Sequence, residues 1–537
     1  MTPFLRCAAR SFPLSLALAA PTFAQAPRVV ATIQLPTTHT LTGVLAIDVD
    51  GDGIGDLVLA CRDAATKRRE LRLHRGRAAA DGSPAFANEP SLPPLPIERD
   101  VVAFTFVDAT AAPGRELVLL TPERAVAVAW PTAGAADGGP TDAGAADAGP
   151  RYTPLTEHRS VWPAADPDFV LPLADVRCDF DGDGHDDLLL PVPDGALLQS
   201  LHVPTRRHTL TLPPRRSPTA KSANGGASLQ DGQLSLSLAT GDGDDDDAAK
   251  GPLVRLRTRT PVARLQDLDG DGTQELVAVR NDQLFVGRLL ADRLAGDRPG
   301  AADLVAAGSD AAGFTVTTRA LPVPEDRLTL FDPTFDVQLV DVDGDRRLDL
   351  VLTTSARRDD AIEVRIDLFR TAADGSWAKK PDARLRLQTL ARPPQLVDAD
   401  GDGRLDLVAL SLRTESLRDP TRASPEALEA QLLVFRGDGT RFVQPAALGE
   451  LLRLPVTAGR ASFAEVLPGT TAAPGALLLA VDDTLVRRPL RSDGDRLRLA
   501  PPTTTLPVPA DAQLQFDEAS GDVLVRTGHE LLVVRTR

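Results

Sequence analysis

The sequence predicts an all-β protein in which one four-stranded unit is repeated along the chain. An acidic ten-residue motif recurs five times, short apolar runs flank every copy, and the copies begin at intervals that leave room for four strands and their loops. The 45 Pro and 41 Gly suit many short strands joined by turns. A hydrophobic content of 42% excludes disorder of the whole chain.

The acidic motif has the form Asp-x-Asp-Gly-Asp-Gly-x-x-Asp-Leu, and its first copy begins at Asp48. The apolar run Val44–Ile47 precedes this copy, and a second run, Leu57–Ala60, follows it. Runs of this length between turn residues are typical of strands. The motif therefore predicts a loop between two strands, and the other four copies begin at Asp179, Asp267, Asp341 and Asp398.

Three weaker copies keep the flanking apolar runs without the middle carboxylates, and they begin near Asp108, Glu465 and Asp517. The eight starts are 52 to 88 residues apart. Four-stranded units of this kind protect their edges by radial repetition, which predicts a β-propeller. We expect eight blades, or seven if one weak copy is only a loop; separate β-sandwiches are the alternative. The strand predicted at Val29–Leu35 would complete the last blade and close the ring.

The N-terminus has the features of an export signal. Arg6 and Arg10 supply a positive start before an apolar run from Ser11 to Ala20, and Ala24-Gln-Ala26 fits a cleavage site. An internal apolar helix is the alternative. We expect a signal peptide at 1–26 and a single domain at 27–537, with low-complexity loops at about 133–150 and 215–251. No later segment approaches the roughly 18 apolar residues of a spanning helix. These features predict an exported protein (extracellular, cell-surface or periplasmic) without a transmembrane segment.

The charge and the cysteines limit the partners and the source of stability. The net charge is -16, and about -18 without the signal, which argues against nucleic acid and anionic membranes as partners. Cys61 and Cys178 lie in separate repeats, so two buried thiols are favoured over a disulfide. Stability must then come from elsewhere, and metal binding is the candidate.

The acidic loops have the chemistry of calcium sites. Carboxylates at positions 1, 3, 5 and 9 converge if the backbone turns tightly, and Gly at positions 4 and 6 permits the positive φ that this turn needs. The carbonyl of position 7 adds another hard oxygen, and such a set selects Ca²⁺. An EF-hand is excluded because position 12 is Leu59 or its equivalent in a strand, and no Cys/His set accompanies the loops to suggest zinc. The predicted ligands are Asp48, Asp50, Asp52, Ile54, Asp56; Asp179, Asp181, Asp183, His185, Asp187; Asp267, Asp269, Asp271, Thr273, Glu275; Asp341, Asp343, Asp345, Arg347, Asp349; and Asp398, Asp400, Asp402, Arg404, Asp406.

The five predicted sites are not equal. Arg346 stands where the other loops have Gly at position 6, so the Asp341 site should be the weakest, because positive φ costs a non-Gly residue about 1 kcal/mol. Glu275 is longer than Asp but can still coordinate. The alternative for all five is a solvated acidic turn without metal. The three weak copies should bind no metal.

The acidic loop between two strands, repeated along the chain, resembles the FG-GAP/VCBS repeats of the integrin α-subunit propeller and of many exported bacterial proteins. The resemblance implies that calcium is structural and that other loops form the ligand-binding surface. It favours a non-enzymatic module that binds a protein or a glycan. The alternatives are a propeller-borne polysaccharide lyase or hydrolase, for which seven His and one Tyr give no recognisable constellation, and a purely structural calcium-binding protein.

Overall fold

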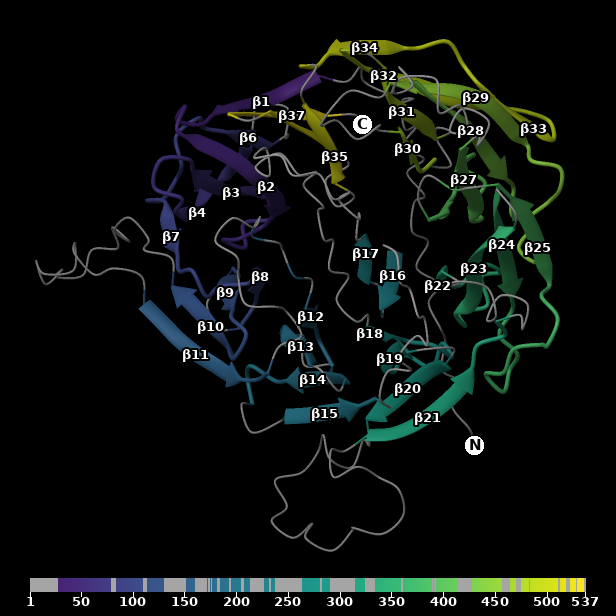
Figure 1. Cartoon of the computed structure of the whole chain (residues 1–537), viewed down its shortest axis with the longest axis horizontal. Coiled ribbons are helices and arrows are strands. Elements are labelled where there is room, and N and C mark those ends of the chain that lie inside the picture. The colour runs from purple at the N-terminus through teal and green to yellow at the C-terminus, as the bar shows by residue number, and fades with distance from the viewer. Residues whose placement is uncertain are drawn as a thin grey trace, which may run out of the picture.

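The computed structural model describes 28–78, 84–109, 114–129, 151–159, 171, 174, 176–180, 184–192, 195–203, 207–212, 227–230, 233–236, 263–280, 283–289, 314–323, 334–358, 361–388, 390, 393–412, 427–455, 464–469, 475–481, 483–509, 512–517, 522–527 and 529–535. These residues form strands and no helix, and eight sheets stand around a ring (Figure 1). Within the described ranges, no helix has the length and apolarity needed to cross a membrane. The predicted signal peptide lies outside them.

Each sheet is one blade of antiparallel strands, four strands in seven blades and five in blade 7, and the blades follow one another in chain order. Blade 1 contains β2 (His39–Ile47), β3 (Asp56–Asp63), β4 (Arg69–His74) and β7 (Leu95–Ile97). Blade 2 contains β8 (Ala103–Val107), β9 (Glu116–Leu120), β10 (Arg124–Ala129) and β11 (Arg151–Glu157). Blade 3 contains β12 (Arg177–Cys178), β13 (Asp187–Val192), β14 (Gly195–Gln199) and β15 (Arg207–Thr211). Blade 4 contains β18 (Ala263–Gln266), β19 (Glu275–Arg280), β20 (Gln283–Leu289) and β21 (Phe314–Ala320).

The second half of the ring repeats this arrangement. Blade 5 contains β22 (Thr334–Val340), β23 (Asp349–Arg358), β24 (Ala361–Phe369) and β25 (Ala383–Leu387). Blade 6 contains β26 (Gln395–Val397), β27 (Asp406–Leu412), β28 (Ala427–Phe435) and β29 (Leu448–Pro455). In blade 7, β30 (Ala464–Leu467) and β31 (Ala476–Val481) precede the long β32 (Thr484–Asp493), whose two halves pair with β33 (Arg496–Leu499) and β34 (Thr504–Pro507). Blade 8 contains β35 (Gln513–Asp517), β36 (Asp522–Arg526), β37 (Glu530–Arg535) and β1 (Arg28–Gln34).

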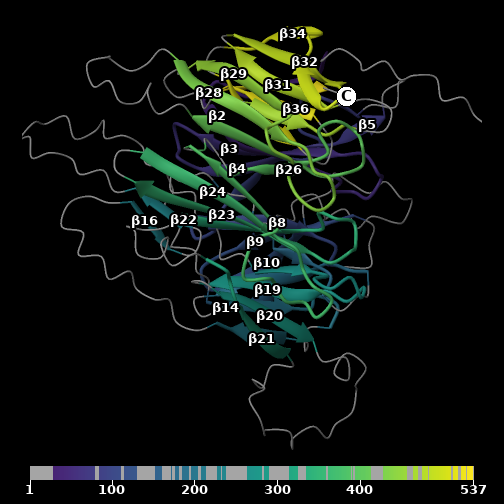
Figure 2. The same ribbon diagram turned by 90° about the vertical axis from the view of Figure 1, so that its right-hand side faces the viewer.

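The first strand of each blade lies nearest the centre of the ring, and the last lies at its outer edge (Figure 1). The second strand is the most buried, as in β3, where Leu57–Ala60 is buried without alternation. A strand covered on both faces needs apolar side chains on both, which explains the continuous apolar runs after each acidic motif. Figure 2 shows the blades stacked against one another when the ring is viewed from its side.

The hydrophobic core is divided among the contacts between neighbouring blades. One cluster joins blades 1 and 2, in which Leu73 packs with Phe104 and Phe106. The other clusters join each further pair of neighbours around the ring, including blades 8 and 1. Each blade therefore buries both of its faces only when it has two neighbours, and this requirement favours a closed ring.

The N-terminal strand closes the ring, as predicted. β1 pairs antiparallel with β37, and Ile33 opposite Leu531 is fully buried. The Leu35 amide donates a further hydrogen bond of 2.8 Å to the His529 carbonyl. The prediction of eight blades is confirmed, and the seven-blade alternative is wrong. Two of the weak copies begin slightly earlier than the complete copies, whose first Asp follows the first strand of the blade. Glu465 lies inside β30, opposite Leu478, and Asp517 is the last residue of β35.

Two small hairpins stand outside the blades. β5 (Gly76–Ala78) pairs with β6 (Pro84–Phe86), and β16 (Ala227–Gln230) pairs with β17 (Gln233–Leu236). The second hairpin lies within the predicted loop at 215–251, whose remaining residues are outside the described ranges, as is the predicted loop at 133–150. Cys61 is buried and Cys178 is half-buried, and no disulfide joins these two described residues.

Candidate metal sites

The acidic loops connect the first and second strands of their blades, so they lie at the inner end of each sheet. Neighbouring loops contact one another through their backbones. The Arg115 amide donates to the Val49 carbonyl at 2.7 Å, and the Leu348 amide donates to the Leu268 carbonyl at 3.0 Å. The Gly469 amide likewise donates to the Asp398 carbonyl at 2.6 Å. Any group that fixes one loop therefore also supports the next blade.

The carboxylate at position 9 holds the loop from within. Asp406, only 1% exposed, accepts hydrogen bonds from the Ala399 amide at 3.0 Å and the Gly437 amide at 2.9 Å. Asp56 accepts the corresponding bonds from Val49 at 2.8 Å and Gly76 at 2.7 Å. Asp187, Glu275 and Asp349 accept the same amide from position 2 of their own loops. Position 9 therefore joins the loop to the start of the second strand and to the end of the third.

Positions 1 and 5 shape the tight turn that the sequence predicts. Asp398 accepts hydrogen bonds from the amides of Gly401 at 2.7 Å and Gly403 at 2.9 Å, and these two glycines have φ of 81° and 84°. Asp402 accepts the amide of Arg404, at position 7, at 2.8 Å. A chain of carboxylate-to-amide bonds thus wraps the backbone around a centre on which the carboxylates converge.

Four loops bring three carboxylates within 4.8 Å of one another. In three of them the group comes from positions 1, 3 and 9, and in blade 4 it comes from positions 1, 3 and 5, so Glu275 is not part of it. Asp52, Asp345 and Asp402, at position 5 of the other three loops, are not part of the triads. The triads are Asp48, Asp50 and Asp56; Asp267, Asp269 and Asp271; Asp341, Asp343 and Asp349; and Asp398, Asp400 and Asp406.

The triads fit a hard cation. Asp50 Oδ1 and Asp269 Oδ1 are both buried and have no hydrogen-bond partner among the described residues. A buried carboxylate oxygen without a partner is costly, and a divalent cation removes that cost. Because the donors are all carboxylate oxygens, Ca²⁺ suits the set better than zinc.

The pKa values of the loop carboxyl groups also reflect the cost of burying their charge. Burial raises the pKa of Asp349 and of Asp406 to about 6, with their neighbouring carboxylates adding to the shift. Burial also raises the pKa of Asp56, Glu275 and Asp343 above their usual values. Protons are therefore held more tightly at these carboxyl groups, because burial disfavours the charged form more than the nearby guanidinium groups favour it.

The fourth loop has the irregularity that the sequence predicts. Arg346 has a φ of 71°, a left-handed conformation unusual for a residue with a Cβ, and its amide donates to Asp341 at 2.8 Å. The Arg347 guanidinium pairs with Asp345, which adds a second cation beside this loop. Metal binding by the position-7 carbonyls stays a prediction for Ile54, His185, Thr273, Arg347 and Arg404.

The loop of blade 3 is only partly described, because Asp181 and Asp183 lie outside the described residues. Asp179 accepts the Gly184 amide at 3.1 Å, as position 1 does elsewhere. The His185 side chain is 38% exposed, and its ring centroid lies 3.7 Å from that of His202, which follows β14.

Sequence reasoning missed two features of these sites. An arginine from the end of the third strand contacts the position 3 carboxylate in four blades. Blades 2 and 8, whose loops lack the middle carboxylates, still carry an acid at position 9, namely Glu116 and Asp522, opposite the last residue of the first strand. Aligning the third strands of the repeats would have revealed the arginines, and aligning the second strands would have revealed the acids.

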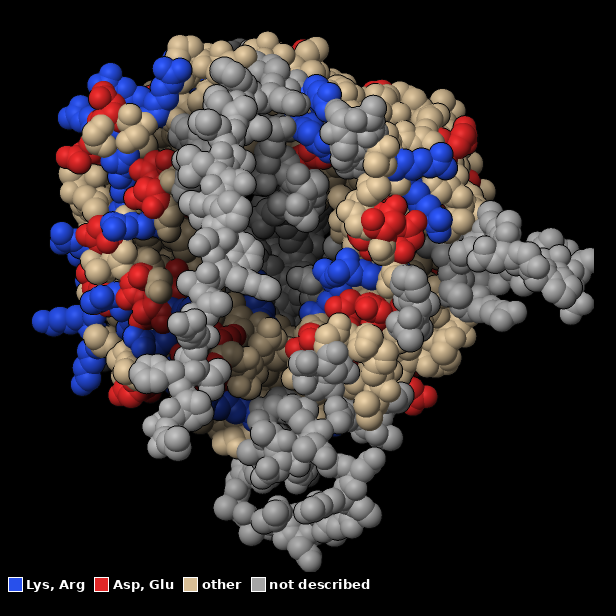
Figure 3. All heavy atoms as spheres, turned by 180° about the vertical axis from the view of Figure 1, so that it is seen from behind, with Lys and Arg blue, Asp and Glu red and all other residues tan. Residues whose placement is uncertain are grey.

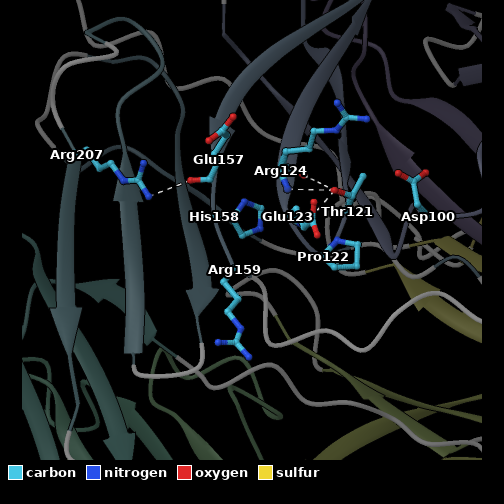
Figure 4. A pocket seen from close by; sticks show the side chains of 9 residues that line it. All are labelled: Asp100, Thr121, Pro122, Glu123, Arg124, Glu157, His158, Arg159 and Arg207. Atoms are coloured by element: carbon cyan, nitrogen blue, oxygen red, sulfur yellow. Dashed lines mark hydrogen bonds between the residues drawn. The ribbon is translucent and has the colours of Figure 1, made fainter.

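A pocket of about 800 Å³ lies away from the acidic loops, where the turn between β9 and β10 and the end of β11 in blade 2 meet the start of β15 in blade 3 (Figure 4). Its lining includes His158, 7% exposed, whose ring nitrogens have no hydrogen-bond partner among the described residues. Burial, together with the charge of Arg207, lowers the pKa of His158 to about 4, so the imidazole is neutral. Besides Thr121 and Pro122, three arginines and three carboxylates complete the lining, namely Arg124, Arg159, Arg207, Asp100, Glu123 and Glu157.

One face of the described ring carries charged side chains of both signs. Figure 3 shows acidic and basic side chains intermixed over the described part of one face rather than gathered into a patch of one sign. Of the three tryptophans, Trp130 and Trp162 lie outside the described residues. Trp377 is half-buried, and its indole donates to the Thr371 hydroxyl at 3.0 Å. This tryptophan is thus part of a blade and not an exposed aromatic platform.

The fold and the loops define an eight-bladed β-propeller with acidic loops on its inner hairpins. Residues 327–409 match the model of the FG-GAP-like repeat, which includes the loops that begin at Asp341 and Asp398. This match confirms the FG-GAP resemblance predicted from the motifs. A solved structure described as "Structure of Dos1 propeller" is similar over 95% of each chain, with 9% identity and a TM-score of 0.38. No curated protein matches the sequence.

Proposed function

We propose that this protein is an exported β-propeller that binds calcium in its acidic loops and serves as a non-enzymatic binding module for a protein or a glycan. Propellers with FG-GAP-like repeats are in general interaction or structural modules, which supports the coarser part of this statement. The observation that carries the calcium proposal is the carboxylate triad, which recurs in the acidic loops of four blades. In two of the triads a buried carboxylate oxygen lacks a hydrogen-bond partner among the described residues.

Calcium would have a structural role in this proposal. The candidate ligands lie on hairpins whose backbones contact the neighbouring hairpins near the centre of the ring. Bound calcium neutralises the carboxylates, while the protein fixes their positions through amide hydrogen bonds to positions 1, 5 and 9. The outer strands and the connections between blades then remain free to differ, and these form the surface that we propose for recognition.

The calcium proposal is tested by calorimetric titration with Ca²⁺ after a chelator has removed bound metal from the protein. We expect binding of several ions and a higher melting temperature, since a ligand at 100 times its Kd stabilises a fold by about 2.7 kcal/mol per site. Asp398→Asn should lose one site, because this residue belongs to a triad. Asp493→Asn, at an exposed ion pair, is the matched control and should lose none. No heat and no thermal shift with the wild-type protein would refute the calcium proposal.

Export and recognition need separate tests. Fractionation of the full-length protein, followed by N-terminal sequencing, should find it outside the cytoplasm and cleaved after Ala24 or Ala26. A glycan array probed with and without chelator should show calcium-dependent binding if the ligand is a glycan. Binding to purified envelope proteins with defined affinity, together with an empty array, would indicate a protein ligand instead.

A further inference from the structure

An arginine stands at one register position in four blades that carry an acidic loop. In each blade the Leu after position 9 pairs with a residue of the third strand, and the arginine comes directly after that residue. Leu407, for example, pairs with Phe435, and Arg436 follows. The other pairings place Arg75, Arg288 and Arg370 at the same position, and Ser200 in blade 3.

All four arginines approach the carboxylate at position 3 of the loop beside them. This repeated contact does not follow from the acidic motif itself, because the arginine comes from a different strand. The contacts join Arg75 Nε to Asp50 Oδ2 at 3.4 Å, Arg370 Nη1 to Asp343 Oδ2 at 3.8 Å, Arg436 Nε to Asp400 Oδ2 at 2.7 Å, and the Arg288 guanidinium to Asp269.

In two blades the arginine contacts one carboxylate oxygen and leaves the other unused. Arg75 and Arg288 face the Oδ2 atoms of Asp50 and Asp269. The Oδ1 atoms of the same two side chains are buried without a hydrogen-bond partner among the described residues. The guanidinium therefore offsets the charge of the triad without taking the oxygen that a metal would use.

Arg436 is held in place independently of the loop. Its Nη1 donates to the Gly494 carbonyl and its Nη2 to the Ser492 hydroxyl of blade 7, both at 2.6 Å. Its side chain is 20% exposed, and its partner Asp400 is 6% exposed. Arg370 is the opposite case, because it is 41% exposed and shares its charge with Asp382 at 3.4 Å.

We propose that these four arginines are internal counter-cations that hold the acidic loops together without calcium and lower the calcium affinity of the same loops. The inference rests on the proposed function, namely that the loops bind calcium. A fixed guanidinium reduces the repulsion among the carboxylates before the ion arrives. The same guanidinium repels a divalent ion that is bound to the carboxylate. This repulsion lowers the calcium affinity by about a factor of ten even at the dielectric constant of water. Arg436 has the largest effect and Arg370 the smallest.

Arg436→Gln separates the two consequences. We expect this variant to melt at a lower temperature than the wild type in chelator, and to bind one calcium ion about tenfold more tightly. Arg436→Lys keeps the charge and should keep the wild-type affinity. Arg441→Gln removes an equal charge from the same blade, at a side chain that is 65% exposed and paired with Asp438, and should change neither quantity. Competition with a chromophoric chelator gives the binding constants, and scanning calorimetry gives the melting temperatures.

The opposite result overturns the inference. If Arg436→Gln binds calcium as the wild type does, or more weakly, the arginine does not act as a counter-cation. If this variant does not fold, Arg75→Gln, at a side chain 39% exposed, provides the same test, with tighter binding expected and unchanged or weaker binding contradicting the inference. If the wild-type protein binds no calcium in the same titration, the proposed function fails and the inference fails with it.

Discussion

Gly437 is a position where a single methyl group should destabilise the blade. It is buried two residues after the end of β28, and its amide donates to Asp406 at 2.9 Å. A Cβ at this position would lie 2.1 Å from the carbonyl oxygen of Leu405, where real Cβ atoms do not come. Gly437→Ala must therefore move either this carbonyl, at position 8 of the loop, or the end of β28.

The cost follows from these two contacts. Overpacking costs about 1–3 kcal/mol, and weakening a hydrogen bond to a buried carboxylate costs about 1–3 kcal/mol. We expect a total of about 2–6 kcal/mol, which corresponds to a fall of about 3–8 °C in melting temperature for the roughly 340 residues that the structure describes. Thr371 of blade 5 occupies the equivalent position and donates its hydroxyl to the Leu348 carbonyl at 2.6 Å. Gly437→Thr should consequently cost less than Gly437→Ala.

Scanning calorimetry in excess calcium and in chelator measures the effect. Gly449→Ala in the same blade is the control, because its Cβ would meet nothing closer than 3.5 Å. The control should shift the melting temperature by less than about 1 °C, as a tolerated substitution does. The reasoning is refuted if Gly437→Ala melts within 1 °C of the wild type, or if Gly449→Ala falls as far.

Three further outcomes follow from the structure. In chelator, the pKa of Asp349 and of Asp406 is about 6 in the folded protein, above the value of 3.8 for the unfolded chain. Protonation of each group therefore stabilises the fold by about 3 kcal/mol below about pH 4, and this stabilisation is lost as the pH rises through 6. A melting temperature that rises from pH 5 to pH 7 would contradict this prediction. Arg346→Gly should gain about 1 kcal/mol because φ is 71° at this residue, and calorimetry showing a loss would exclude relief of backbone strain. Ile33→Ala, at a fully buried position of the closing strand, should cost about 2–5 kcal/mol in urea unfolding, whereas Val29→Ala, 42% exposed, should cost little.

The ring was predictable because its repeat is local. The first and second strands of each blade flank the acidic motif, so Val44–Ile47 and Leu57–Ala60 indicate a hairpin without any long-range information. The third and fourth strands of the blades carry no motif of this kind. The contact between Arg436 and Asp400 joins residues 36 positions apart, and only the strand register brings them together. Local pattern therefore predicts the loops, while the arginines that offset them need the sheet.

The position 9 carboxylate has a role that does not depend on metal. Glu116 stands in a blade without the middle carboxylates, yet it accepts the Ala109 amide at 2.9 Å, as Asp56 accepts the Val49 amide in a complete loop. Asp522, in another such blade, is 3% exposed and pairs with Arg535 at 3.3 Å. A carboxylate at position 9 is thus useful for the backbone of the hairpin alone. Calcium would act on a hairpin already folded by these hydrogen bonds, so chelation should loosen the ring without unfolding its blades.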